Sequence, residues 1–241
     1  MTFHRIAVCI PTYNERENIL AIAQAVREAL PTADILVVDD NSPDGTAAIV
    51  HEFQKENPWL KLHVREEKKG LGAAYIDGFQ RLIAAGYDII IQMDADFSHQ
   101  PKYLPHFIEE IDKGADVVIG SRYVKGGGTE NWNIIRRIIS RGGSLYSRTI
   151  LGLHQHDVTA GYKCWRAETL RKVIVGDLKL SGFGFQIEMS FRTKLVGAKI
   201  KEYPIIFPDR EKGVSKMSGK IFKEALFGVW KLLVLGHRVF E

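Results

Sequence analysis

The sequence IIIQMDADFSHQP, residues 89–101, places two carboxylates one residue apart at the point where an apolar run ends. A short run rich in isoleucine is typical of a strand buried on both faces of a parallel sheet. Asp94 and Asp96 follow this run, and neighbouring anions repel each other unless a positive group lies between them. Because open parallel sheets bind ligands beyond the carboxyl ends of their strands, the stretch predicts a cation and a ligand at this edge.

Other runs rich in valine and isoleucine extend this sheet. They predict strands at residues 5–11, 33–40, 60–66, 87–94 and 115–122, separated by amphipathic segments of helix length. This alternation is typical of an α/β fold with a doubly wound, mostly parallel sheet and helices on both faces. With 241 residues, of which 45% are hydrophobic, the chain is expected to form a single domain over residues 1–241.

Cysteine content and hydropathy favour a cytoplasmic location. Cys9 and Cys164 form neither a C-x-x-C motif nor a disulfide framework, as expected of a reducing compartment. The N-terminus does not read as a signal peptide, and no run of about eighteen apolar residues predicts a transmembrane helix.

Positive charge is concentrated in two zones. Residues 121–150 carry six Lys/Arg against one acid, and residues 194–241 carry ten against five. Such zones are either solvated helical faces or anion sites, with phosphates and anionic membrane surfaces as the expected partners. No nucleic acid is expected, because the basic residues are not interleaved with stacking aromatics.

Polar residues follow the predicted strands. Besides Asp94 and Asp96 they are Pro11, Thr12, Tyr13, Asn14, Glu15, Asp39, Asp40, Asn41, Ser121 and Arg122. Mg²⁺ and Mn²⁺ use few protein carboxylates and complete their coordination with diphosphate oxygens and water. The rim therefore predicts a nucleotide site with one of these metals.

Other chemistries fit the motifs less well. Gly70 and Gly72 lack the third small residue of a dinucleotide fingerprint and follow the third predicted strand, so they indicate a helix start. Walker, H-E-x-x-H and G-x-S-x-G motifs are absent. Carboxylates one residue apart cannot straddle a glycosidic bond as a glycosidase pair would.

Six ordered blocks point to a known family. The blocks PTYNERENI, VVDDNSPDGT, GLGAAYIDGF, MDADFSHQP, GSRY and VTAGYKCWR resemble inverting glycosyltransferases of family 2 with the GT-A fold, specifically polyprenyl/dolichyl-phosphate mannose synthases. The resemblance runs from about residue 6 to residue 218. It implies a nucleotide-sugar half over about residues 1–122 and an acceptor half over about residues 123–241.

The resemblance also implies the donor site. Contacts to GDP-mannose would come from Pro11, Tyr13, Glu15, Val38, Asp40, Asp94, Ala95, Asp96, Arg210 and Lys216. Asp94 and Asp96 would bind Mg²⁺ or Mn²⁺, and Ser98 stands where some members have a metal-binding Gln, which leaves Ser98 or water as the third ligand. Asp39 could instead cap the following helix, and Tyr13 could pack on the sheet edge.

The first basic zone resembles the family's acceptor-phosphate segment. Arg122, Arg136 and Ser140 fall on the phosphate-contacting positions, whereas Arg137 and Arg141 could be simple surface charges. Arg210 and Lys216 lie on a segment that resembles the family's mobile donor loop. The residues expected to carry catalysis are Asp96, Arg122, Arg136 and Arg210.

The implied reaction transfers mannose to a polyprenyl or dolichyl monophosphate. Such a phosphate, with a second pKa of about 6, is already a nucleophile at neutral pH, so no general base is expected. Inversion would give a β-linked product. Two alternatives stay open: another donor such as UDP-glucose, or a silent nucleotide-sugar-binding subunit that recruits a membrane partner.

The C-terminal stretch predicts an amphipathic helix. Its apolar positions at helical spacing are Phe222, Leu226, Val229, Trp230 and Leu233, with Lys220, Lys223 and Lys231 nearby. The helix could pack onto the domain or insert partly into a cytoplasmic leaflet. Expected partners are thus the membrane surface, bound peripherally, and a small membrane protein.

Overall fold

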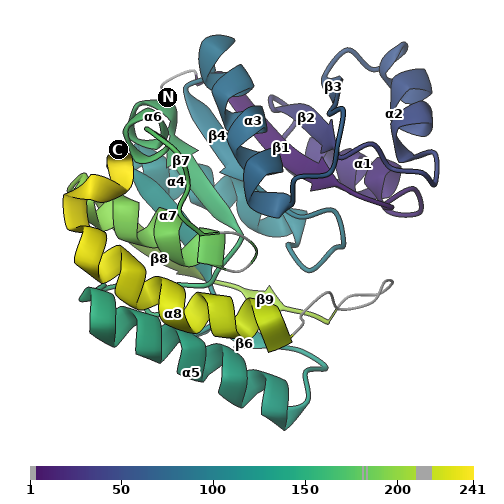
Figure 1. Ribbon diagram of the computed structural model, residues 1–241. Helices are drawn as coiled ribbons and strands as arrows, with labels where there is room; N and C mark the ends of the chain where they lie inside the picture. The colour runs from purple at the N-terminus through teal and green to yellow at the C-terminus, as the bar shows by residue number, and fades with distance from the viewer. Residues whose placement is uncertain (1–3, 181, 183, 210–218) are drawn as a thin grey trace.

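The computed structural model describes residues 4–180, 182, 184–209 and 219–241, with side chains of 219–225 left aside. Within them lies a seven-stranded sheet in the order β3-β2-β1-β4-β7-β5-β8 (Figure 1). Its strands are β1 (Ile6–Thr12), β2 (Asp34–Asp39), β3 (Leu60–Val64), β4 (Ile89–Gln92), β5 (Val117–Ser121), β7 (Lys163–Arg166) and β8 (Ile200–Pro204). A smaller sheet pairs β6 (Gly128–Thr129) with β9 (Ile206–Phe207).

Helices cover both faces of the large sheet. They are α1 (Ile19–Ala29), α2 (Thr46–Gln54), α3 (Leu71–Ala84), α4 (Leu104–Asp112), α5 (Ile134–Leu151), α6 (Ala167–Val173), α7 (Gly184–Leu195) and α8 (Gly219–Leu235), with short 3₁₀ turns at Pro101–Tyr103 and Gly236–Phe240. The predicted α/β fold with a mostly parallel sheet is confirmed, and each of the five predicted strands forms.

The core is divided by the sheet into two layers. Ile89 and Ile91 of β4 pack with α1 and α4 on one face, whereas Ile90 packs with α3, α6 and α7 on the other. Because both faces are covered, the strand needs apolar side chains at consecutive positions, which explains the run of isoleucines. Because the buried strand β4 is held in place by the core, it also determines the position of Asp94 and Asp96, which follow it.

Two strands of the large sheet, like both short strands of the small sheet, fall outside the five predicted ones. β7 is antiparallel to both β4 and β5 and lies between them, and β8 pairs with β5 in parallel. β7 is only four residues long, and β8 lies at the sheet edge with the charged residues Lys201 and Glu202 among its five. Neither has the long apolar run that marks the central strands.

Two glycines serve α3, one through its backbone conformation and the other through close packing. Gly70 precedes the helix with φ +91°, a conformation that L side chains rarely adopt. A Cβ on Gly78 would lie 2.4 Å from the Sγ of Cys9, so only glycine lets α3 approach β1 this closely. The interpretation of Gly70 as a helix start is therefore confirmed.

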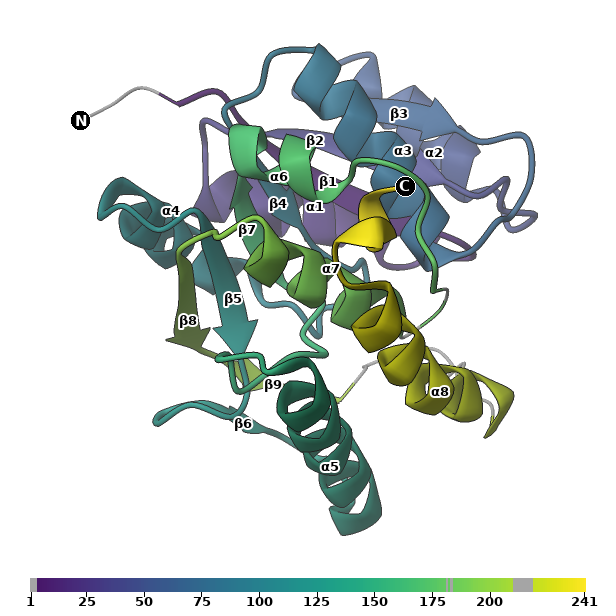
Figure 2. The same ribbon diagram turned by 60° about the vertical axis from the view of Figure 1, so that its left-hand side comes forward.

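The second half of the chain adds a layer of long helices. α5 and α8 run side by side below the sheet in Figure 1, and Figure 2 shows the same pairing after rotation. The Tyr146 hydroxyl of α5 donates a 3.0 Å hydrogen bond to the Leu226 carbonyl of α8. Val229 and Leu232 of α8 pack with Phe191 of α7 in a third apolar cluster.

Candidate functional site

The carboxyl ends of the parallel strands gather the polar residues that the sequence singled out. β1, β2 and β4 are adjacent, and β4 is separated from β5 by β7 alone. At ordinary strand spacing, the ends of β4 and β5 therefore lie roughly 10 Å apart. This edge brings aspartates from β2 and β4 together with Arg122, which follows β5.

Asp94 is oriented by a residue that the sequence did not reveal. The Tyr75 hydroxyl of α3 donates a 2.7 Å hydrogen bond to Asp94 Oδ1. Tyr75 is fully buried and stacks on Phe79 and Phe185 at centroid distances of 5.5 and 5.9 Å. Burial, together with the nearby Asp94 carboxylate, raises the pKa of Tyr75 well above its usual value. Tyr75 therefore stays protonated and keeps donating to the carboxylate.

Asp96 is held by its own turn. The main-chain N–H and the hydroxyl of Ser98 both donate to Asp96 Oδ1, at 3.1 and 2.5 Å. Ser98 is buried, and Phe97 between them has φ +60°. Of the two candidates for a third metal ligand, Ser98 thus uses its hydroxyl to orient Asp96.

His99 holds the main chain of Asp94. Its Nδ1 accepts a 2.9 Å hydrogen bond from the Asp94 main-chain N–H, and its ring stacks on Tyr162 at 4.8 Å. Among the described residues, no group of three or more His, Cys, Asp or Glu side chains is arranged to hold a metal. A pair of carboxylates still suits a metal that is completed by substrate phosphates and water.

Asp39 stabilises the end of the second strand. It accepts hydrogen bonds from the Thr12 hydroxyl at 2.7 Å and from the Ser42 N–H and hydroxyl at 2.8 and 2.6 Å. The expected alternative, a cap on the following helix, is wrong, because α2 begins at Thr46 and the Thr46 N–H donates to Asp44 Oδ1 at 2.9 Å. Asp39 instead joins the ends of β1 and β2.

Asp40 forms an ion pair that the sequence did not predict. Arg65, which follows β3, forms a 2.5 Å ion pair with it, and both side chains are almost buried. Burial raises the pKa of Asp40, with Arg65 opposing the shift. Asp40 and Arg65 therefore form a nearly buried ion pair at the ends of β2 and β3.

The remaining donor candidates have distinct environments. Lys68 Nζ lies 3.5 Å from the ring centroid of Tyr13, and Glu15 accepts a 3.0 Å hydrogen bond from Asn18 Nδ2. Pro11 pairs in register with Val38, whose side chain is fully buried in the core. Any nucleoside contact of Val38 would therefore use its main chain. Ala95 is buried between the two aspartates.

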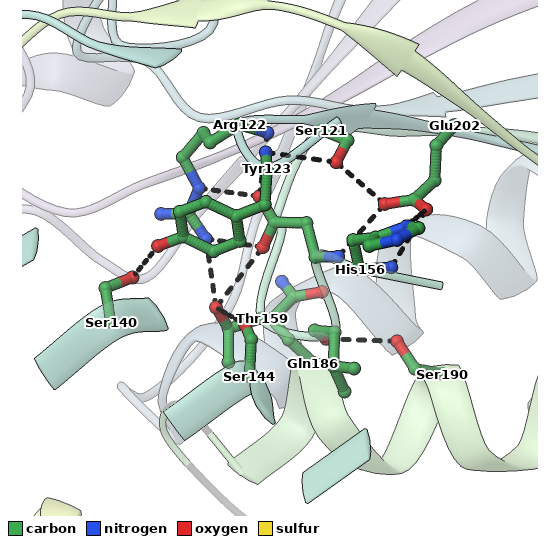
Figure 3. A network of polar contacts seen from close by, with 12 residues as sticks. Ser121, Arg122, Tyr123, Ser140, Ser144, His156, Thr159, Gln186, Ser190 and Glu202 are labelled. Carbon is green, nitrogen blue, oxygen red and sulfur yellow. Dashed lines mark hydrogen bonds and ion pairs between the residues drawn. The ribbon is translucent and has the colours of Figure 1, made fainter. Parts of the chain in front are cut away.

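Arg122 is neutralised from within the protein (Figure 3). Its Nε and Nη2 donate to the two oxygens of Asp157 at 2.7 and 2.6 Å, and Nη2 also donates to Thr159 at 2.9 Å. Burial alone would lower the pKa of Arg122, but the Asp157 carboxylate outweighs it and the pKa lies above its usual value. The guanidinium of Arg122, which could make two hydrogen bonds to a phosphate, thus makes them to Asp157.

Arg136 and Ser140 come from the first half of α5. The Arg136 Nη1 lies 2.5 Å from Asp209 Oδ1, and its guanidinium lies 3.9 Å from the Trp132 ring centroid. The Ser140 hydroxyl accepts a 2.6 Å hydrogen bond from Tyr123, the residue after Arg122 (Figure 3). This hydrogen bond links α5 to the segment after β5, and the role of Arg136 and Ser140 toward an acceptor phosphate stays a prediction. Arg210 and Lys216 lie outside the described residues.

Glu202 of β8 is the centre of the network behind Arg122. It accepts from the Ser121 hydroxyl at 2.7 Å, the Asp157 N–H at 2.9 Å, and the His156 N–H and Nδ1 at 2.8 and 2.9 Å (Figure 3). These bonds fix the loop that presents Asp157. Glu202 lies 81 residues from Ser121 in sequence, so no local pattern could have found it.

A buried lysine lies below the same edge. Lys163 of β7 donates a 2.8 Å hydrogen bond to Gln186 Oε1, and burial lowers the pKa of Lys163 to about 7. Its cross-strand neighbour on β4 is Gln92, whose side-chain amide is buried without a hydrogen-bond partner in the described part of the chain. Lys163, Gln186 and Gln92 therefore provide polar side chains inside the core below this sheet edge.

Comparison with known proteins places this geometry in a family. Residues 7–174 match the model of the family described as Glycosyl transferase family 2. The chain is 48% identical over 225 residues to the undecaprenyl-phosphate mannosyltransferase of Micrococcus luteus, covering 93% of this chain and 92% of that protein. It is 46% identical over 227 residues to the polyprenol monophosphomannose synthase of Mycolicibacterium smegmatis, covering 93% and 85%.

Solved structures share the fold. The mannosyltransferase PcManGT from Pyrobaculum calidifontis, solved with GDP-Man and Mn²⁺, is 16% identical with a TM-score of 0.61, covering 99% of this chain and 72% of that one. The glucosyl-3-phosphoglycerate synthase of Mycobacterium tuberculosis, also 16% identical, has a TM-score of 0.67 with 96% and 80% covered. The family match and the identities to the curated relatives establish that the chain belongs to glycosyl transferase family 2 and is a glycosyltransferase.

Proposed function

We propose that this enzyme transfers mannose from GDP-mannose to a polyprenyl monophosphate of the dolichyl type, releasing GDP. The observation that carries the proposal is the Asp94–Asp96 pair after β4, in the same sheet whose strand β5 is followed by Arg122. Support for the substrates comes from relatives named undecaprenyl-phosphate and polyprenol mannosyltransferases, and from a structural neighbour bound to GDP-Man.

Asp94 and Asp96 would hold Mg²⁺ or Mn²⁺. Both carboxylates are oriented by hydrogen bonds, from Tyr75 and Ser98, which suits a metal that takes few protein ligands. A bound divalent cation would neutralise charge on the departing diphosphate. Pro11, Tyr13, Glu15, Asp40 and the main chain of Val38 would hold the nucleoside, with Arg210 and Lys216 as further predicted contacts to the diphosphate.

The acceptor phosphate would lie between β4 and α5. As a dianion it attacks the anomeric carbon without a general base, and attack opposite the departing GDP inverts the configuration to a β-linkage. Arg136 and Ser140 would orient this phosphate. Arg122 would contribute positive charge from its fixed position against Asp157, and Arg136 would exchange its contact with Asp209 for one with the phosphate.

The enzyme would work at a membrane surface, bound peripherally. Within the described ranges, no helix is both long and apolar enough to span a bilayer. On α8, Phe227 and Trp230 are 70% and 52% exposed, while Val229 and Leu232 pack inward. The two interpretations of this helix are therefore compatible, since one face packs and another offers apolar side chains to lipid.

The test is a reconstituted transfer. Purified protein is incubated with GDP-mannose, Mg²⁺ or Mn²⁺ and a short polyprenyl phosphate, and GDP release is measured together with mannolipid formation. The proposal requires both products in equal amounts, abolished by a chelator. Faster turnover with UDP-glucose would reassign the donor, whereas GDP-mannose binding without any product would indicate a binding subunit.

A further inference from the structure

A basic hollow lies on one side of α5. It has a volume of about 290 Å³ and lies between the loop after β5, β6 and the helix. Its walls are Arg122, Tyr123, Arg137, Arg141 and the segment 127–129, with no acidic residue among them. A hollow lined by three arginines and no carboxylate favours the binding of an anion.

Two of the three arginines keep their charge uncompensated. Arg122 is paired with Asp157, and the other arginine of the proposed acceptor site, Arg136, is paired with Asp209. In the part of the chain that the structure describes, no carboxylate forms an ion pair with Arg137 or Arg141. Arg137 Nη2 makes only a long 3.4 Å contact to the Thr129 carbonyl, and Arg141 lies over the Tyr123 ring at 6.0 Å.

The same helix exposes large apolar side chains. Ile134, Ile138 and Leu145 are 73%, 66% and 61% exposed, on a helix whose polar and apolar residues are strongly segregated. Isoleucines next to unpaired arginines are typical of a helix lying in the interface of an anionic bilayer. An acidic peptide or a soluble phosphate would account for the arginines but not for these side chains.

We propose that the hollow binds the phosphate of an anionic phospholipid headgroup, held by Arg137 and Arg141 while the isoleucines of α5 enter the headgroup boundary. Guanidinium forks match phosphate oxygens, and the volume accommodates a phosphoglycerol group. The hollow adjoins the proposed acceptor contacts, because Arg122 and Tyr123 line it and Tyr123 donates to Ser140, but Arg137 and Arg141 are not among those contacts. This inference rests on the proposed association with a membrane surface.

The test compares two double variants that each remove two exposed charges. Arg137→Gln/Arg141→Gln alters the hollow, and Arg171→Gln/Lys172→Gln alters α6, which lies at the other end of the molecule from α5 (Figure 2). Binding is measured by sedimentation with vesicles of phosphatidylcholine alone or mixed with phosphatidylglycerol. The first variant should bind the mixed vesicles on the order of thirtyfold more weakly and the neutral vesicles unchanged. The control pair should behave as the unaltered protein, since screening removes charges beyond about 10 Å.

Several outcomes would overturn the proposal. Equal binding of the unaltered protein to both vesicles, or an equal loss in the two variants, would remove any role for a specific hollow. Transfer to a water-soluble, short-chain polyprenyl phosphate without vesicles should be the same in all three proteins. A raised KM in the Arg137→Gln/Arg141→Gln variant would assign the hollow to the acceptor phosphate instead. Absence of transfer in the unaltered protein would contradict the proposed reaction, while the vesicle measurements would still decide the headgroup site.

Discussion

At the scale of single residues, substitution of Asp96 can distinguish a role in metal binding from a role in holding its turn. Its Oδ1 accepts two hydrogen bonds from Ser98, and asparagine would keep an oxygen for them. We expect Asp96→Asn to retain the melting temperature but to reduce transfer at least about a hundredfold, because a neutral amide is a poor ligand for a divalent cation. The measurement is GDP release at saturating Mg²⁺, with Asp112→Asn on the surface of α4 as control. Near-normal turnover of Asp96→Asn would contradict the metal assignment.

Lys163 gives a prediction about pH and stability. Its folded pKa of about 7 lies below the unfolded value of 10.5, so between these pH values the unfolded chain binds a proton that the folded chain does not. The free energy of unfolding therefore falls as the pH is lowered from 10.5 to 7. Lys163→Met removes this penalty but leaves Gln186 without its partner.

The Lys163→Met variant should accordingly gain stability relative to the parent by about 4 kcal/mol more at pH 7 than at pH 10. Urea unfolding of both proteins at the two pH values measures this difference, and the titration of other groups cancels. A difference that does not change with pH would mean that Lys163 is charged in the folded protein.

Sequence motifs identified residues near one another in the chain and missed those brought together by the fold. Asp94, Asp96 and Ser98 belong to one turn and were all singled out. Tyr75 contacts Asp94 from 19 residues away and Asp157 contacts Arg122 from 35 residues away, and single-sequence patterns contain no signal for such pairings.

At the scale of elements, β8 supports the site through Glu202. Its carboxylate accepts four hydrogen bonds from the ends of β5 and the loop before β7. In Glu202→Gln the amide NH₂ would face a donor, which costs about 1–3 kcal/mol of stability. Because the displaced loop carries Asp157 and hence Arg122, we expect the KM for the acceptor to rise while GDP-mannose affinity stays unchanged.

The control for Glu202→Gln is Glu110→Gln, which removes an exposed pair with Lys113 on α4. Acceptor titrations and calorimetric donor titrations of both variants distinguish positioning from general destabilisation. Should both substrates bind Glu202→Gln equally poorly, Glu202 would be a purely structural residue.

The central strands were predictable because burial on both faces imposes a continuous apolar run. β7 escaped prediction because its four residues include the buried Lys163, whose environment is polar, and because its antiparallel insertion between β4 and β5 depends on contacts distant in sequence. The block that contains it, VTAGYKCWR, was interpreted as a family motif and not as a strand.

At the scale of the whole molecule, positive and negative charges come from different elements. The basic zone over residues 121–150 falls on the end of β5 and on α5, whereas the aspartates of the candidate site lie at the end of β2 and after β4. Because β4 and β5 belong to one sheet, the donor and acceptor halves predicted on either side of about residue 122 would share that sheet.

If donor and acceptor contact different elements, substitutions in the basic zone should weaken acceptor use without weakening donor binding. If Arg136 grips the acceptor phosphate, Arg136→Ala loses a charge-assisted hydrogen bond worth about 1.5–3 kcal/mol, which corresponds to a tenfold to hundredfold loss in kcat/KM for the acceptor. GDP-mannose affinity should barely change. Arg148→Ala, three turns further along α5, removes the same charge and should affect neither substrate.

Paired titrations of donor and acceptor on both variants test this division. Because Asp209 loses its partner in Arg136→Ala, Asp209→Asn must be measured as well. It should strengthen acceptor binding, since a competing carboxylate is removed from the arginine. If Arg136→Ala instead weakened donor binding as much as acceptor use, the basic segment after Ser121 would belong to the nucleotide site, and the two halves would share a single anion pocket.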